Sequence, residues 1–217
     1  MSHKVHPKIF RIGSIYTWDS KWFSRKNYAK FLREDLAIRA YLMKEFKDVG
    51  MDSIGIERTP HDITVSLSAA KPGMIIGRGG AGAEELRKKV QKKFFDIKTN
   101  VKVNILEVSR PALSATIIGQ SVVIEIEKRV PFRRVLKQAV ERARKAGALG
   151  VKIAVSGRLN GAEIARREFI TEGKIPLQNL RSDIDFNATT AHTIYGVIGI
   201  KVWVYRGDIF ASKEINK

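Results

Sequence analysis

The residues best suited to bind a ligand form one short run, Gly77-Arg78-Gly79-Gly80, and the chemistry they suit is phosphate binding. A tight glycine turn at the start of a helix leaves backbone N–H groups without partners. Those groups, together with the positive end of the helix dipole, attract phosphate. Glycine has no Cβ, so a sugar-phosphate chain can lie close to the backbone. Arg78 lies at the tip of the turn, where its guanidinium could donate to the same phosphate.

Two lysines in the helix pattern that follows, Lys88 and Lys89, could line the same groove. A solvated helix face and a purely structural glycine turn are the alternatives for this region. Gly77, Gly79 and Gly82 also match the dinucleotide-binding pattern, which needs a strand directly before it and a parallel strand after the helix. No series of alternating strands and helices follows, so the pattern favours nucleic acid over a dinucleotide.

A second group of cations lies between Lys128 and Lys145, a stretch with eight basic residues and one acid. Arg133 and Lys137 are four residues apart and share a helix face, and Arg134 lies beside them. Positive side chains in the first turn of a helix oppose the helix dipole, at a cost of about 0.3 kcal/mol or more each. A bound polyanion would offset that cost, so this cluster is a second candidate for nucleic-acid binding. A basic solvated face is the alternative.

The charge of the whole chain agrees with a polyanionic partner. The 217 residues include 40 Lys and Arg against 22 Asp and Glu, a net charge of +18, and the excess divides equally between residues 1–108 and 109–217. Positive charge on both halves is typical of a protein surrounded by nucleic acid. The absence of cysteine excludes disulfides. No apolar run is long enough to span a membrane and no secretory signal is visible, so we expect a cytoplasmic protein.

Arrangements that would support catalysis are weak. Of the four histidines only His3 and His6 are close in the sequence; with no cysteine no zinc-binding spacing is visible, and a flexible arm is favoured over a weak metal site at that pair. Asp183 and Asp185 could hold magnesium or act as acid and base, but nearby arginines favour ion pairs that stabilise a sheet. We therefore predict no enzyme activity, no catalytic residue, no metal site and no cofactor.

Secondary structure must position these residues. Apolar residues at helical spacing predict one helix over 28–47 and another directly after the glycine turn. Alternating apolar residues predict three strands, at 54–56, 63–69 and 101–105. The order helix, strand, strand, helix, strand is a split α+β unit of ordinary domain size.

The second half of the chain predicts two helices followed by strands. Pro111 can open a helix that runs to Lys128, and Pro131 can open the next, because proline suits the first helical position. Strand-like runs follow at 151–155, 164–171, 181–186 and 197–205. We expect a mainly antiparallel sheet packed against the two helices.

Several motifs, in this order, resemble those of one protein family, the bacterial S-three family of small-subunit ribosomal proteins. The strand, Gly-x-x-Gly turn and helix by themselves resemble any KH domain. The more specific likeness lies in motifs at 71–73, 132–134, 155–158, 161–166 and 195–203, read as KPG, FRR, VSGR, GAEIAR and YGVIGIKVW. The likeness covers nearly the whole chain.

The resemblance implies an α+β fold in four parts: a basic N-terminal arm at 1–16, a type II KH RNA-binding domain at 17–108, a C-terminal α/β domain at 109–210 and a short tail at 211–217. The family is cytoplasmic and lies in the head of the small ribosomal subunit. There it binds ribosomal RNA, and it lines the channel where messenger RNA enters, beside ribosomal proteins S-ten and S-fourteen. The resemblance implies neither a membrane nor a small-molecule substrate.

The resemblance also assigns residues. By match, Arg133, Arg134 and Lys137 face the message and help to hold and unwind it. Contacts to ribosomal RNA are implied for six basic residues: Lys4, Lys8, Arg11, Arg158, Arg166 and Arg167. Many relatives have two basic residues between the turn glycines, whereas here Arg78 is followed by Gly79, so any electrostatic contact rests on Arg78. A free KH-type RNA-binding regulator outside the ribosome is the alternative function.

Overall fold

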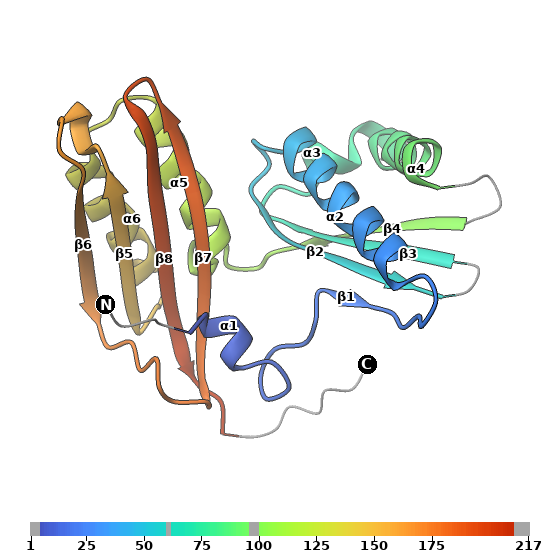
Figure 1. Ribbon diagram of the computed structural model, residues 1–217, viewed down its shortest axis with the longest axis horizontal. Coiled ribbons are helices and arrows are strands. Elements are labelled where there is room, and N and C mark those ends of the chain that lie inside the picture. The colour runs from blue at the N-terminus through green and yellow to red at the C-terminus, as the bar shows by residue number, and fades with distance from the viewer. Residues whose placement is uncertain (1–4, 60–61, 96–99, 211–217) are drawn as a thin grey trace. The chain divides into compact units, whose positions relative to one another are not determined.

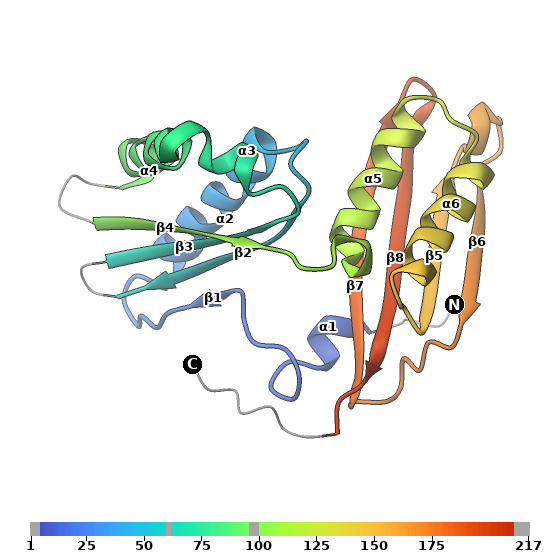
Figure 2. The same ribbon diagram turned by 180° about the vertical axis from the view of Figure 1, so that it is seen from behind.

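The computed structural model describes residues 5–59, 62–95 and 100–210. Their contacts divide the chain into two compact units. One unit is formed by Trp18–Ser109, and the other joins the residues up to Thr17 to those from Arg110 onward. Each unit has its own sheet, helices and hydrophobic core (Figure 1 and Figure 2).

The unit of Trp18–Ser109 is a four-stranded sheet packed against helices. Its strands lie in the order β1-β2-β3-β4; β2 and β3 are antiparallel, and the two outer pairings are parallel. The elements in chain order are β1 (Ser20–Lys21), α2 (Tyr28–Glu45), β2 (Met51–Arg58), β3 (Asp62–Ala69), α3 (Gly73–Ile76), η1 (Arg78–Gly80), α4 (Ala81–Phe94) and β4 (Asn100–Glu107). In β3 alternate residues are buried, because successive side chains of a strand point to opposite faces.

Helix α2 buries only part of the apolar pattern that predicts it, and a charged residue lies among the buried ones. Leu32 and Leu36 share the helical apolar spacing with the buried Ile38 and Leu42 but are 40% and 59% exposed. The buried stripe instead includes Asp35. The Asp35 carboxylate accepts hydrogen bonds from Arg58 Nε at 2.9 Å and from Trp22 Nε1 at 2.8 Å. A charged residue therefore takes a core position because both of its oxygens are satisfied there.

The other unit contains an antiparallel sheet in the order β6-β5-β8-β7. Helices α5 and α6 pack against this sheet in one core, which confirms the predicted fold class (Figure 2). The elements are α1 (Pro7–Phe10), η2 (Pro111–Leu113), α5 (Ala115–Glu127), α6 (Phe132–Lys145), β5 (Gly150–Gly157), η3 (Leu159–Gly161), β6 (Arg166–Gly173), β7 (Ser182–Thr193) and β8 (Gly196–Asp208).

The largest boundary differences from the prediction in this unit are at the start of α5 and at the end of β7. The helix expected from Pro111 begins at Ala115, and Pro111 opens only the short 3₁₀ turn η2. Ser114 has an extended backbone, and its hydroxyl accepts the Ile117 N–H at 3.2 Å, so Ser114 is the N-cap of α5. Strand β7 continues to Thr193 because it pairs with β8 along its whole length.

The N-terminal segment, expected as a basic arm at 1–16, is partly helical and packed against the fold in its described part. Its described part contains α1, opened by Pro7 at a position that suits proline. Helix α1 packs against β7, and the segment up to Thr17 belongs to the same unit as the residues from Arg110 onward. The predicted tail at 211–217 lies outside the described residues.

Candidate nucleic-acid interface

The glycine turn has a backbone that requires glycine. Helix α3 ends at Gly77, and φ is 69° at Gly77, 61° at Gly79 and 82° at Gly80. These values lie where side chains with a Cβ are strained. Gly80 is the N-cap residue of α4, and no side chain caps that helix start. The first N–H groups of α4 therefore face the turn without a side-chain acceptor.

Gly82 serves packing rather than a dinucleotide. A Cβ at Gly82 would lie 2.6 Å from the Ile75 carbonyl oxygen and 3.0 Å from that of Ile76. The end of α3 thus lies directly against the first turn of α4, which only glycine permits. This contact gives the Gly-x-Gly-x-x-Gly match a structural cause.

The three cations predicted at this turn differ in their partners. Arg78 and Lys88 are exposed, and neither forms an ion pair with another residue in the described ranges. Lys89 pairs with Glu85 at 2.9 Å and with Glu45 at 3.6 Å. The hydrogen bond that Lys89 donates to the Glu85 carboxylate raises the pKa of Lys89, so its charge is retained but partly offset. Arg78 and Lys88 are therefore the stronger candidates for a phosphate contact.

Helix α6 separates its apolar and basic residues cleanly. The buried face packs on the sheet and consists of Phe132, Val135, Leu136, Ala139, Val140 and Ala143. Arg133, Arg134 and Lys137 lie on the exposed face, as the helical spacing predicts.

One of these three cations is already engaged. Arg133 Nε lies 3.3 Å from Glu168 on β6, and Arg166 Nε lies 3.0 Å from the same carboxylate. The hydrogen bond from Arg133 is the main cause that holds the pKa of Glu168 below its ordinary value. Within the described residues, Arg134 and Lys137 form no ion pair. The charge at the start of α6 is thus only partly balanced within the chain.

Two N-terminal cations that were expected to contact RNA, Lys8 and Arg11, form contacts within the protein. Arg11 is fully buried, and its guanidinium donates to the carbonyls of Pro7 at 2.8 Å, Leu177 at 3.0 Å and Asn179 at 2.7 Å. The prediction that Arg11 contacts RNA is wrong, because its side chain is fully buried and a phosphate cannot reach it. Lys4 lies outside the described residues.

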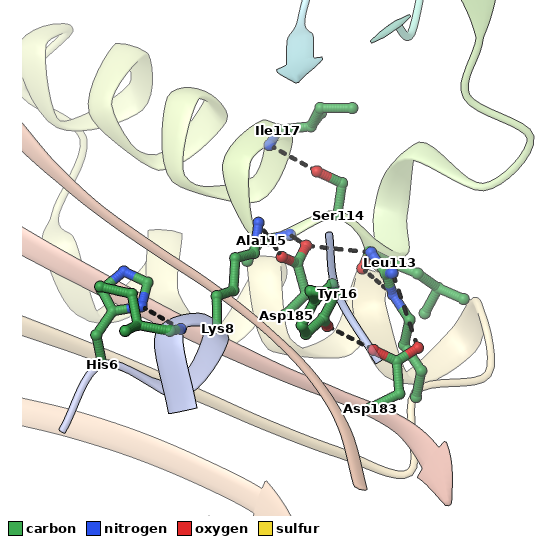
Figure 3. A network of polar contacts seen from close by, with 11 residues as sticks. His6, Lys8, Tyr16, Leu113, Ser114, Ala115, Ile117, Asp183 and Asp185 are labelled. Atoms are coloured by element: carbon green, nitrogen blue, oxygen red, sulfur yellow. Dashed lines mark hydrogen bonds and ion pairs between the residues drawn. The ribbon is translucent and has the colours of Figure 1, made fainter. Parts of the chain in front are cut away.

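Lys8 belongs to a polar network around Asp185, whose side chain is only 4% exposed (Figure 3). The Asp185 carboxylate lies 2.7 Å from Lys8 Nζ and 3.1 Å from Arg206, and it accepts the Ala115 N–H at the start of α5 at 2.7 Å. Asp185 therefore balances two cations, Lys8 and Arg206, and a helix N-terminus.

Asp183 extends this network to the end of the N-terminal segment (Figure 3). The Tyr16 hydroxyl donates to the Asp183 carboxylate at 2.5 Å. The pKa of the Tyr16 phenol is raised above its ordinary value. Burial is the larger cause, and the hydrogen bond to Asp183 is the next. Arg181, one of the arginines near these carboxylates in the sequence, pairs with Asp208 at 3.6 Å.

The remaining candidates lie around the loop after β5 and on β6. Arg158 is half-buried and donates to the Ala162 carbonyl at 2.8 Å and the Tyr195 carbonyl at 3.4 Å. Arg167 is exposed, without an ion pair to another described residue. Arg158 also lines a pocket together with Arg129, which lies in the basic stretch 128–145 but was not singled out within it.

Among residues 5–59, 62–95 and 100–210, no group of three or more metal-ligating side chains is close enough to hold an ion. No helix in those ranges has the length and apolar character to cross a bilayer.

Comparison with known proteins gives matches over the whole chain. Residues 122–204 match the family described as Ribosomal protein S3, C-terminal domain, and residues 37–113 match the family described as KH domain. The chain is 48% identical, over all of its 217 residues, to the small ribosomal subunit protein uS3 of Streptococcus sanguinis (strain SK36). It has the same identity to that of Streptococcus pneumoniae (strain Hungary19A-6), and the match covers 99% of each relative.

Proposed function

Because this chain belongs to the uS3 family of small ribosomal subunit proteins, we propose that its exposed cations bind ribosomal RNA and messenger RNA during translation. Its place is the small ribosomal subunit, in the cytoplasm, and its KH domain makes RNA its natural ligand. Its relatives are ribosomal proteins, and the chain itself acts by binding rather than by catalysis. The full-length likeness favours this function over that of a free KH regulator.

The observation that carries the proposal is the exposed face of α6. Arg134 and Lys137 are three residues apart, so they project from the same side of a helix whose other side is locked in the core. Lysine and arginine displace counterions from phosphates, and that release drives binding. A rigid helix holds the two charges at a fixed spacing, which suits a backbone with regularly spaced phosphates.

Such a surface can assist unwinding without hydrolysing a nucleotide. We place Arg133, Arg134 and Lys137 beside message as it enters. Cations that hold a single strand more tightly than a duplex favour the open form while another part of the ribosome pulls the message forward. Arg133 is partly neutralised by Glu168 at 3.3 Å, so Arg134 and Lys137 carry most of this effect.

Translation through structured message tests this function. Ribosomes with Arg134→Ala and Lys137→Ala should pause longer at a stable hairpin than wild-type ribosomes, with little change on open message. The matched control is Lys145→Ala, which removes a cation of the same helix that pairs with Glu141 at 2.7 Å. Equal slowing on both messages, or equal slowing by the control, would contradict the proposed role.

The contacts to neighbours rest on family membership. We propose that Lys8, Arg158, Arg166 and Arg167 lie near ribosomal RNA, and that ribosomal proteins S-ten and S-fourteen are the protein neighbours. Arg167 is the strongest of these four candidates, because it is exposed and unpaired among the described residues. Crosslinking of assembled subunits, with mapping of the linked peptides, checks each contact; RNA links at β6 are expected.

A further inference from the structure

A pocket of about 360 Å³ lies in the unit that contains the antiparallel sheet. Three connections line it: the turn between α5 and α6, the loop after β5, and the turn between β7 and β8. Figure 1 shows these connections together at one end of the sheet. No role proposed above uses this pocket as a site.

The pocket presents a fixed aromatic ring. Tyr195, in the turn between β7 and β8, is 56% exposed. A Cβ on Gly161 would lie 3.1 Å from the Tyr195 ring, so the ring packs closely on the Gly161 backbone. The Arg158 guanidinium lies 5.9 Å from the ring centroid, and it also donates to the Tyr195 carbonyl at 3.4 Å. The ring is therefore held in place while part of its surface stays open.

The charges around this ring are mainly positive. Arg158 and Arg129 line the pocket, and Arg129 is exposed and forms no ion pair with another described residue. Arg129 has φ of 62°, a backbone conformation that side chains with a Cβ rarely adopt, so its position is set by the turn. Glu127 is the acid in the lining, and one of its oxygens accepts the His192 backbone N–H at 3.2 Å. A negatively charged ligand with a flat apolar face would suit this lining.

We propose that the pocket binds one unstacked nucleotide of single-stranded RNA, with its base on Tyr195 and its phosphate beside Arg129 and Arg158. Proteins recognise unpaired RNA by stacking bases on aromatic rings and on guanidinium planes. The volume is at the lower end of the range for small-molecule sites, which suits one nucleotide and excludes a helical stem. The proposal rests on the RNA-binding function above, and it adds a site that distinguishes unpaired RNA from duplex.

The test uses the full purified chain and a short single-stranded oligoribonucleotide. Ultraviolet crosslinking should link the RNA to the peptide that contains Tyr195. Tyr195→Ala should weaken binding roughly tenfold, because stacking of one base contributes about that much. Tyr195→Phe should keep most of the affinity, since the ring is retained. Tyr28→Ala is the control, because Tyr28 has a similar exposure of 58% in the other unit and should leave affinity unchanged.

The outcomes separate this proposal from the function on which it rests. If wild-type chain binds RNA and Tyr195→Ala binds equally well, the pocket is not a nucleotide site, while the proposed function stands. If the chain binds no RNA even in dilute buffer, both fail. If Tyr195→Ala does not fold, Arg129→Ala supplies the same test, with several-fold weaker binding expected. Equal binding of a blunt duplex through the same peptide, or protection of Tyr195 by an acidic peptide and not by RNA, would also overturn it.

Discussion

At the scale of single residues, the role of a cation depends on the acceptors that already surround it. Arg11 and Arg134 are the same residue type, yet Arg11 is buried and donates to four backbone carbonyls, whereas Arg134 is exposed without an ion pair in the described ranges. The first stabilises the fold, and the second is available to RNA. Composition alone does not distinguish them.

Removal of the Arg11 side chain should destabilise the protein without a direct effect on RNA contacts. Arg11→Ala leaves the carbonyls of Pro7, Leu177 and Asn179 without their donor, which should cost about 2–3 kcal/mol of unfolding free energy. Urea unfolding followed by circular dichroism measures the loss. Arg167→Ala, an exposed control, should change stability by less than about 0.5 kcal/mol. A loss in the control as large as that in Arg11→Ala would refute the distinction.

The Tyr16 hydroxyl should make the stability depend on alkaline pH. Burial and the bond to Asp183 raise the pKa of Tyr16, so the folded state holds this proton more tightly than the unfolded state. Its contribution is complete below the unfolded value of about 10 and is lost as pH rises above it. Tyr16→Phe should therefore show a shallower loss of melting temperature between about pH 9 and 11 than wild type. Identical pH profiles would show that Tyr16 is not the titrating group.

At the scale of elements, the spacing of apolar residues predicts the longer helices and strands. Features that depend on contacts between distant parts of the chain are not predicted by it. The helix around Leu136 and the strand from Ile63 follow directly from apolar spacing, and so does the exposure of Lys137. Helices α1 and α3 have four residues each, too few to show a period. The burial of Arg11 depends on carbonyls more than a hundred and sixty positions away, which no local pattern contains.

The packing of α3 on α4 gives the sharpest test of an element contact. Gly82→Ala should destabilise the KH unit, the unit of Trp18–Ser109, by about 1–3 kcal/mol, because its Cβ would lie 2.6 Å from the Ile75 carbonyl oxygen and the backbone must shift. The matched control is Gly73→Ala in the same region, where a Cβ would meet nothing within 4 Å. Thermal unfolding measures both variants. Equal stability of the two would show that the close approach does not constrain the turn.

At the scale of the whole molecule, the N-terminal segment completes a unit whose other residues begin at Arg110. The Lys8 ion pair, the buried Arg11 and the Tyr16 hydrogen bond all attach it to that unit. The KH unit is therefore inserted between two parts of the other unit in the chain. The sequence pattern predicts a domain boundary near residue 109. It contains no signal that the residues up to Thr17 fold with those from Arg110 onward.

The most direct test of the central claim is the salt dependence of single-stranded RNA binding by the full chain. If Arg134 and Lys137 each contact a phosphate, Arg134→Ala with Lys137→Ala should reduce the slope of log affinity against log salt by about 1.4. Lys145→Ala should leave the slope unchanged, because Lys145 pairs with Glu141. An unchanged slope in the double variant would contradict the claim that the exposed face of α6 binds the RNA backbone.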